Sequence, residues 1–249
     1  MAYYDNFVRH AHPRWAKRLL VRFNRQVLGY ILRGFPGRKK LSVLEIGPGK
    51  GYFYEATRSV RGERMEYFCC DQNAVALKQF PAENAFQASV PPLPETGRSF
   101  DIIYAAYVIE HLANGKQVYD LVQSCRENLN SGGVLVLLAP DSRSQGFEFW
   151  NMDYTHSYPT TMRNVAMILR ENGFSEISIL PINGLLTVPG FERWPVYQVI
   201  RVFFFLYDYR VFQALFGWVF RKRVYDLDNP FYQLFCFAKQ RNLMFIAQK

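Results

Sequence analysis

The stretch LSVLEIGPGKGY, residues 41–52, decides the fold, because an apolar run passes directly into a loop with glycine at positions 47, 49 and 51. Glycine in a turn between a strand and a helix lets the backbone approach a ligand closely at the helix N-terminus. We therefore expect a strand over residues 42–46, and the loop after it predicts a binding site for a nucleotide-like ligand.

Further apolar runs follow along the chain and alternate with helical stretches. These runs are EYFCCD (66–71), AFQAS (85–89), FDIIYAA (100–106), GVLVLLAP (133–140), SEISILPI (175–182) and NLMFIAQK (242–249). Continuous apolar runs indicate strands that are buried on both faces, as in a parallel sheet covered by helices. The sequence therefore predicts an α/β fold, with a further helix around residues 160–171.

The composition excludes intrinsic disorder, because 49% of the 249 residues are hydrophobic and 17% are aromatic. The four cysteines form no C-x-x-C pair, which disfavours a zinc knuckle or a secreted disulfide framework and favours reduced thiols in a cytosol. The first ten residues lack the apolar segment of a signal peptide, so we expect the chain to stay inside the cell. A formal charge of +9 fits a polyanionic partner (nucleic acid, acidic lipid or a phosphorylated substrate) or merely a soluble basic protein.

Residues 11–33 are predicted to form a basic amphipathic helix within an N-terminal segment, residues 1–40. The apolar stripe of this helix is Trp15, Leu19, Leu20, Phe23, Val27 and Ile31, and basic residues lie mostly opposite. Two interpretations stay open: a helix packed on the core with its basic face in water, or a helix that lies on a membrane surface or covers a substrate.

Residues 183–241 are rich in aromatic side chains and are interpreted as an insertion, helical in character, into a core made of residues 41–182 and 242–249. Arg201, Asp208 and Arg210 interrupt the most apolar stretch, which argues against a membrane-spanning helix. The basic run at 221–223 is typical of an interfacial helix near anionic headgroups. A lid over the active site, the interface of a homodimer, and contact with a membrane surface all stay open for this insertion.

The residues around the glycine loop separate several kinds of nucleotide site. A dinucleotide fingerprint requires glycine at position 52, where Tyr52 stands, and a P-loop requires Ser or Thr after its Gly-Lys pair. Both differences disfavour a phosphate cradle. Asp71 ends the next strand about twenty residues after the loop, where a carboxylate can accept hydrogen bonds from both ribose hydroxyls.

The pattern acid-x-Gly-x-Gly-x-Gly that begins at Glu45 resembles the first motif of class I S-adenosylmethionine-dependent methyltransferases. Asp71, the stretch SFDIIYAAYVIEHL (99–112) and the stretch LNSGGVLV (129–136) resemble further motifs of that family in the right order, with Ser131 where proline is usual. The resemblance implies a Rossmann-like, seven-stranded, mostly parallel sheet with helices on both faces and an antiparallel last strand. It also implies S-adenosylmethionine as the methyl donor and S-adenosylhomocysteine as the product.

The loop flanked by Glu45 and Asp71 suits the sulfonium and amino charges of that donor, which carries no phosphate. The cofactor-binding positions that the resemblance implies are Glu45, Gly47, Pro48, Gly49, Gly51, Asp71, Gln72, Ser89 and Ala106. Ser89 stands where the family often has an aspartate that contacts adenine, and its hydroxyl can still form a hydrogen bond.

Methyl transfer needs alignment of acceptor, methyl group and leaving sulfur, with at most one proton to remove, so few catalytic residues are needed. The chain has neither the Asn/Asp-Pro-Pro-Tyr loop of base-amine methylation nor the Pro-Cys pair of pyrimidine C5 methylation, which disfavours nucleic acid as the acceptor. His111 and His156 are the candidate bases, because histidine titrates near neutrality. We expect no metal ion at this site.

For His111 a structural role in capping or packing stays open beside catalysis. Asp153 is expected either to orient His156 by a hydrogen bond or, together with it, to order the loop and cap the helix near Thr160. The stretch WNMDYTHSYPT, residues 150–160, looks like one in bacterial methyltransferases of cell-surface glycan and glycolipid synthesis.

This second likeness implies methyl transfer to a hydroxyl of a sugar or lipid-linked intermediate, by an enzyme that is cytoplasmic or peripheral on the inner face of the cytoplasmic membrane. Two alternatives stay open. One is an O- or N-methyltransferase of a soluble aromatic or secondary metabolite, whose acceptor would rest in an aromatic-lined pocket. The other is a non-catalytic module that keeps the fold as a binding surface.

Overall fold

A computed structural model of the protein describes residues 13–37, 40–60, 65–183 and 241–249, with three isolated positions at 202, 214 and 218. The expected insertion at 183–241 lies almost wholly outside the described residues, as do His10 and His12. Among the described helices, none combines the length and the apolar character needed to cross a membrane. The division into an N-terminal segment, a core and an insertion therefore stays a proposal.

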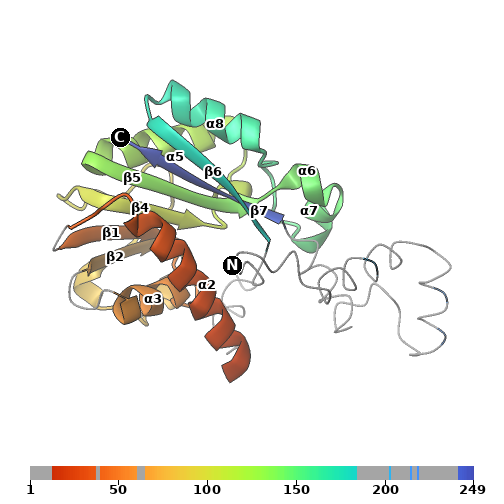
Figure 1. Ribbon diagram of the computed structural model, residues 1–249, viewed down its shortest axis with the longest axis horizontal. Coiled ribbons are helices and arrows are strands. Elements are labelled where there is room, and N and C mark those ends of the chain that lie inside the picture. Colours follow the sequence, from red (N-terminus) through yellow and green to blue (C-terminus); the bar gives the residue numbers. More distant parts are fainter. Residues whose placement is uncertain are drawn as a thin grey trace.

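The described strands form one seven-stranded sheet in the order β3-β2-β1-β4-β5-β7-β6 (Figure 1). The strands are β1 (Leu41–Ile46), β2 (Met65–Asp71), β3 (Ala85–Gln87), β4 (Phe100–Ala106), β5 (Leu129–Pro140), β6 (Ser175–Asn183) and β7 (Arg241–Gln248). Strands β1 to β5 pair in parallel, whereas β7 lies antiparallel between β5 and β6. The sequence-based prediction of a mostly parallel sheet with an antiparallel last strand is confirmed.

Helices cover both faces of this sheet (Figure 1). They are α2 (Arg14–Leu32), α3 (Tyr52–Val60), α4 (Ala74–Leu77), α5 (Gly115–Asn128), α6 (Ser142–Gln145), α7 (Glu148–Met152) and α8 (Met162–Glu171), with 3-10 turns η2 (Ala82–Asn84) and η3 (Ile109–His111). Alternate residues of a strand point to opposite faces, so Leu135 and Leu137 join the core under α5 and α8, whereas Val134 and Val136 join the core under α2 and α3.

Helix α2 is packed on the core, which is the first of the two interpretations that the sequence left open. Phe23, Val27 and Ile31 of the predicted stripe are buried, but Leu19 is exposed. Val21 and Leu28, outside the predicted stripe, are buried as well. The helix lies against α3, and Lys17 forms an ion pair with Glu55 across this contact. The buried stripe is therefore centred further round the helix than predicted.

The parallel arrangement brings the carboxyl ends of β1, β2, β4 and β5 to one edge of the sheet. The chain leaves β1 toward β2 on one side and later returns to β4 on the other side, so the strand order reverses between β1 and β4. Open α/β sheets bind ligands outside the carboxyl ends of their strands at such a reversal. Helices α6 and α7 lie beyond the carboxyl end of β5 at this edge (Figure 1).

Gly133, where the chain enters the buried part of β5, provides a test of this architecture. A Cβ atom there would lie 2.9 Å from the carbonyl oxygen of Asn130 and 3.1 Å from those of Phe100 and Asp101, which are backbone atoms of the paired strands. Gly133→Ala is expected to lower the free energy of unfolding by about 1–3 kcal/mol. Denaturant unfolding measures the change.

Gly29→Ala is the matched control, since Gly29 is an exposed residue of α2 at which an added Cβ atom would meet no other atom within 4 Å. Alanine favours helix by about 1 kcal/mol over glycine, so this variant should be neutral or more stable. Equal stability of the Gly133→Ala variant and the wild type would contradict the strand pairing at this position.

Candidate active site

The loop after β1 has a conformation and a close packing that residues with a Cβ atom would not fit at its glycine positions. Gly47, Gly49 and Gly51 all have positive φ angles, of 69°, 50° and 73°. A Cβ atom on Gly51 would lie 3.3 Å from the ring of Phe80, and one on Gly47 would lie 3.0 Å from Cγ2 of Val108. The amide of Gly51 donates to the carbonyl of Pro48 at 2.8 Å, which turns the chain directly into α3. The loop is a cradle that requires glycine for conformation and for space.

Glu45, in the strand that leads to the loop, is buried beneath it. Its carboxyl group accepts a hydrogen bond from the hydroxyl of Tyr67 on β2. Burial raises the pKa of Glu45 to about 8, although the Tyr67 hydrogen bond opposes the shift. The side chain thus joins β1 to β2 under the cradle, and its direct contact with a cofactor stays a prediction.

Asp71 ends β2 beside the cradle. One of its carboxylate oxygens accepts a hydrogen bond from the amide of Asn73 at 2.8 Å, and burial raises the pKa of the half-buried carboxyl above its ordinary value. The amide of Ala88 donates to the carbonyl of Asp71 at 3.0 Å, which brings Ser89 to the same part of the edge. Gln72 and Ser89 are exposed. The structure thus gathers these predicted residues at the carboxyl ends of β2 and β3.

The turn after β4 touches both the cradle and the loop after β5. Val108, against Gly47, precedes η3, and the backbone carbonyl of Glu110 in η3 accepts hydrogen bonds from two successive amides, Ser157 at 2.8 Å and Tyr158 at 3.0 Å. We call this pair of bonds the Glu110 clasp. It fixes residues 153–158 beside η3 and places His111 and His156 side by side, with ring centroids 5.0 Å apart.

The ring of His111 has a defined orientation. Thr155 donates its hydroxyl hydrogen to a carboxylate oxygen of Asp153 at 2.6 Å, so the hydroxyl oxygen accepts from Nδ1–H of His111 at 2.8 Å. The other ring nitrogen, Nε2, then carries the lone pair in the neutral ring. Burial and the neighbouring His156 lower the pKa of His111, which favours that neutral form.

The ring of His156 is oriented differently from the prediction. Its Nδ1 lies 2.5 Å from the carbonyl oxygen of Phe149, which can only accept, so Nδ1 carries the hydrogen and Nε2 the lone pair. The predicted hydrogen bond from the ring to Asp153 is wrong, because Nδ1 of His156 is bonded to the carbonyl of Phe149, whereas Oδ1 of Asp153 accepts from the amide and hydroxyl of Thr155. Asp153 therefore orients His111 through Thr155.

The predicted cap near Thr160 also differs in detail. Thr161 caps α8 in a reciprocal pair of hydrogen bonds with Asn164, so neither Asp153 nor His156 caps that helix. Thr160 itself is buried, and its hydroxyl donates to the carbonyl of Pro140 at the end of β5. The loop is therefore anchored to the sheet immediately after the clasp.

Three features of the site lay beyond the sequence analysis. Tyr107, between Ala106 and η3, has a φ of 58°, a conformation that is rare for a bulky side chain and that concentrates at functional sites. Thr155 links Asp153 to His111. Glu110 has a fully buried carboxyl group. The family-like segment that ends in Glu110-His111-Leu112 could have pointed to Glu110, whereas no local sequence pattern marks Tyr107 or Thr155.

Three exposed aromatic side chains lie on α7 and its flanking residues, at the same edge of the sheet. Phe147 is 90% exposed, Tyr154 is 80% exposed and Trp150 is 46% exposed. We call them the α7 aromatic patch. The ring of Phe149, 5.1 Å from that of Trp150, also packs against His156 at 4.6 Å, so the patch adjoins the histidine pair.

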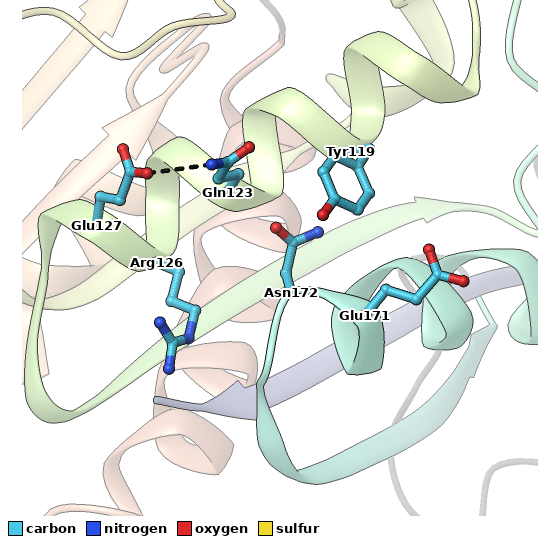
Figure 2. Close-up of a pocket in the computed structure, with 6 residues that line it drawn as sticks. All are labelled: Tyr119, Gln123, Arg126, Glu127, Glu171 and Asn172. Carbon is cyan, nitrogen blue, oxygen red and sulfur yellow. Dashed lines mark hydrogen bonds between the residues drawn. The ribbon is translucent and has the colours of Figure 1, made fainter.

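A polar depression of about 230 Å³ lies elsewhere, between α5 and the end of α8 (Figure 2). Its lining residues are Tyr119, Gln123, Arg126, Glu127, Glu171 and Asn172. Gln123, Arg126 and Glu127 lie in the C-terminal half of α5 and Glu171 ends α8, and these helices lead into β5 and β6, so the depression is near the amino ends of those strands. It is therefore separate from the edge that carries the cradle and the histidines.

The family model described as a methyltransferase domain matches residues 9–179, well over half of the chain. The chain belongs to this methyltransferase family. No protein with a curated description matches it significantly. The fold and the family make the protein a class I S-adenosylmethionine-dependent methyltransferase, as the sequence predicts.

Solved methyltransferase structures share the fold at low sequence identity. The N-methyltransferase NodS from Bradyrhizobium japonicum, crystallised with S-adenosylhomocysteine, has a TM-score of 0.61 and 14% identity, with coverage of 100% of this chain and 97% of that one. An S-adenosylmethionine-dependent methyltransferase from Archaeoglobus fulgidus has a TM-score of 0.53 and 20% identity, with coverage of 90% and 94%.

Phosphoethanolamine N-methyltransferase 2 from Haemonchus contortus, crystallised with S-adenosylmethionine, has a TM-score of 0.53 and 17% identity, covering 90% of this chain but only 52% of that one. S-adenosylmethionine is thus the cofactor of this enzyme class. The cradle of the methyltransferase fits it, because Gly47, Gly49 and Gly51 keep the loop backbone free of side chains and Asp71 supplies a carboxylate at the end of the neighbouring strand β2.

Asp71→Ala tests the cofactor site. Loss of a carboxylate that accepts hydrogen bonds from a ribose is expected to weaken the affinity for S-adenosylhomocysteine about 10- to 100-fold. Isothermal titration calorimetry measures the change. Asp120→Asn, which removes a carboxylate paired with Lys116 on the surface of α5, is the matched control and should bind as the wild type does. Unchanged affinity in Asp71→Ala would remove Asp71 from the cofactor site.

Proposed function

We propose that this methyltransferase transfers a methyl group from S-adenosylmethionine to a hydroxyl of a sugar or lipid-linked intermediate. One observation carries the proposal: the turn after β4 packs Val108 against Gly47 of the cradle and also carries His111, whose ring lies 5.0 Å from that of His156, with Nδ1 of each ring engaged. A hydroxyl loses its proton only to a base in reach, and an imidazole that is neutral near pH 7 suits this role.

In this proposal S-adenosylmethionine supplies an activated methyl carbon when it is bound. The residues of the chain orient the acceptor and hold its proton. The acceptor hydroxyl donates to Nε2 of His156 or His111, and that nitrogen retains the proton as the oxygen becomes the nucleophile. Asp153 stabilises the resulting imidazolium of His111 through Thr155, since the Asp153 carboxylate is negative and Thr155 bridges the two groups.

The α7 aromatic patch supports a sugar or lipid-linked acceptor. Phe147, Trp150 and Tyr154 expose amphipathic or apolar rings next to the histidine pair, and such rings bury the apolar faces of a ligand while polar groups near them fix its orientation. The formal charge of +9 favours an acceptor that carries phosphate or lies at an anionic membrane surface.

The same patch favours a second candidate, O- or N-methylation of a soluble aromatic metabolite, because aromatic rings stack on one another. The solved relatives include N-methyltransferases, which keeps nitrogen open as the methylated atom. Contact of the enzyme with a membrane surface, or closure of residues 183–241 over the acceptor as a lid, belongs to the proposal for the lipid-linked case.

Transfer of labelled methyl from S-adenosylmethionine to a lysate of the source organism separates these candidates. The lysate is divided after reaction into lipid extract, glycan, small aqueous metabolites, RNA and protein. We expect label in the lipid or glycan fraction. Label confined to aqueous metabolites would support the second candidate, and label in RNA or protein would contradict both. No transfer to any fraction would favour a binding module without catalysis.

His156→Gln and His111→Gln test the catalytic assignment. Loss of a general base is expected to lower kcat about 10²- to 10⁴-fold. The affinity for S-adenosylhomocysteine should stay close to that of the wild type. In the wild-type enzyme the acidic limb of the kcat profile should lie below the ordinary histidine pKa of 6.5, because burial lowers the pKa of His111. Gln123→Ala, in the depression at the opposite edge, is the control with full activity. Full turnover in both histidine variants would remove the pair from catalysis.

A further inference from the structure

Glu110 has a carboxyl group in an environment that does not suit it. The residue is 0% exposed, and within the described part of the chain no other side chain donates a hydrogen bond to either carboxylate oxygen. A buried carboxylate without a charged or hydrogen-bonding side chain beside it is costly, and a positively charged partner would offset that cost.

Two imidazole nitrogens lie close to this carboxyl group. One ligand atom each from Glu110, His111 and His156 lies within 4.8 Å of the others. Ring atom Nδ1 of each histidine is already engaged, by Thr155 and by the carbonyl of Phe149. Metal-binding histidines show this arrangement, in which one ring nitrogen donates to an oxygen atom and the other binds the ion.

We propose that Glu110, His111 and His156 bind one divalent transition-metal ion. The assigned ligands are one carboxylate oxygen and Nε2 of each histidine, a set that suits Zn²⁺, Mn²⁺, Fe²⁺ or Co²⁺ better than Mg²⁺ or Ca²⁺, which prefer oxygen ligands alone. This inference reverses the sequence-based expectation of a site without metal, since Glu110 and His111 are adjacent in sequence but His156 is distant.

The geometry requires only a small adjustment. Ligand atoms at about 2.0–2.3 Å from a tetrahedral ion lie about 3.3–3.7 Å from one another, so atoms that lie within 4.8 Å of one another need to approach by about 1.5 Å at most. The Glu110 clasp holds the backbones of η3 and residues 153–158 together, and the side chains supply the movement. The ion would neutralise the carboxylate, which removes the cost of burying it.

Three protein ligands leave a coordination position open, as in catalytic metal sites. On the proposed function, that position takes the acceptor hydroxyl, whose pKa falls on the ion. The hydroxyl proton then leaves to water, because the ion uses the two Nε2 lone pairs. The ion and the imidazoles without an ion are therefore alternative means of removing the same proton.

Titration of the purified full-length protein with Co²⁺, after treatment with a chelator, tests the site. The visible absorption of Co²⁺ bound to nitrogen and oxygen ligands reports occupancy directly, without acceptor or cofactor. We expect saturation at one Co²⁺ per chain and displacement by Zn²⁺. Absence of a saturable one-to-one spectrum would overturn the proposal.

Substitutions locate the ion. Glu110→Gln and His156→Gln are each expected to weaken Co²⁺ affinity at least about 100-fold, since each removes a ligand. Circular dichroism checks folding, and if Glu110→Gln does not fold, the half-buried His156 provides the deciding variant. Wild-type affinity in the folded variants would overturn the proposal.

Two controls exclude other sites. Glu171→Gln removes a carboxylate at the opposite edge of the sheet, and a double variant with His10→Gln and His12→Gln removes the other two histidines of the chain. Both should bind Co²⁺ as the wild type does, and loss of binding in the double variant would overturn the assignment. Binding of Co²⁺ without methyl transfer to lipid or glycan would contradict the proposed function and leave the metal site standing. Methyl transfer to lipid or glycan without Co²⁺ binding would contradict the metal site and leave the proposed function standing.

Discussion

The Glu110 clasp is the interaction on which the candidate site depends. Two backbone amides of the loop after β5 share the carbonyl of Glu110 in the turn after β4, so segments more than forty residues apart become one rigid unit. Backbone hydrogen bonds of this kind do not depend on side-chain rotamers, so the two segments stay joined when the histidine or glutamate side chains change rotamer. His111, from one segment, and His156, from the other, meet because of it.

Parallel strand pairing places this unit beside the cofactor cradle. The carboxyl ends of β1, β4 and β5 share an edge, and Val108 lies against Gly47 at the point where the strand order reverses. An acceptor held by the histidines and the α7 aromatic patch therefore lies at the edge that holds the cradle. Proximity of this kind supplies most of the catalysis that an in-line transfer to an activated carbon needs. A metal ion on Glu110 and the two histidines would strengthen the same arrangement, since it would add a positive charge to a carboxylate that no side chain of the described residues hydrogen-bonds.

Sequence alone predicted the fold well because its signals are local. Apolar runs such as residues 100–106 mark strands that are buried on both faces, and the positive φ angles of Gly47 and Gly51 follow from the glycine pattern. The face that α2 buries was predicted less well, since Val21 and Leu28 are as apolar as their neighbours and only tertiary contact decides which of them are covered. The site was predicted in part: His111, His156 and Asp153 do gather, but Asp153 binds Thr155 instead of His156. Hydrogen-bond partners across a loop depend on backbone geometry that no residue pattern encodes, and the same reason hid the cluster around Glu110.

The clasp brings the two histidine rings together, and their hydrogen-bond partners place hydrogen on Nδ1 and a lone pair on Nε2. Long-range proton–nitrogen NMR of the ¹⁵N-histidine-labelled protein reports the protonated nitrogen of each ring, and single glutamine variants assign His111 and His156. We expect both rings to carry hydrogen on Nδ1, and we expect both sets of signals to shift when S-adenosylhomocysteine is added. A neutral ring with hydrogen on Nε2 and the lone pair on Nδ1, or chemical shifts that do not change when S-adenosylhomocysteine is added, would contradict this arrangement.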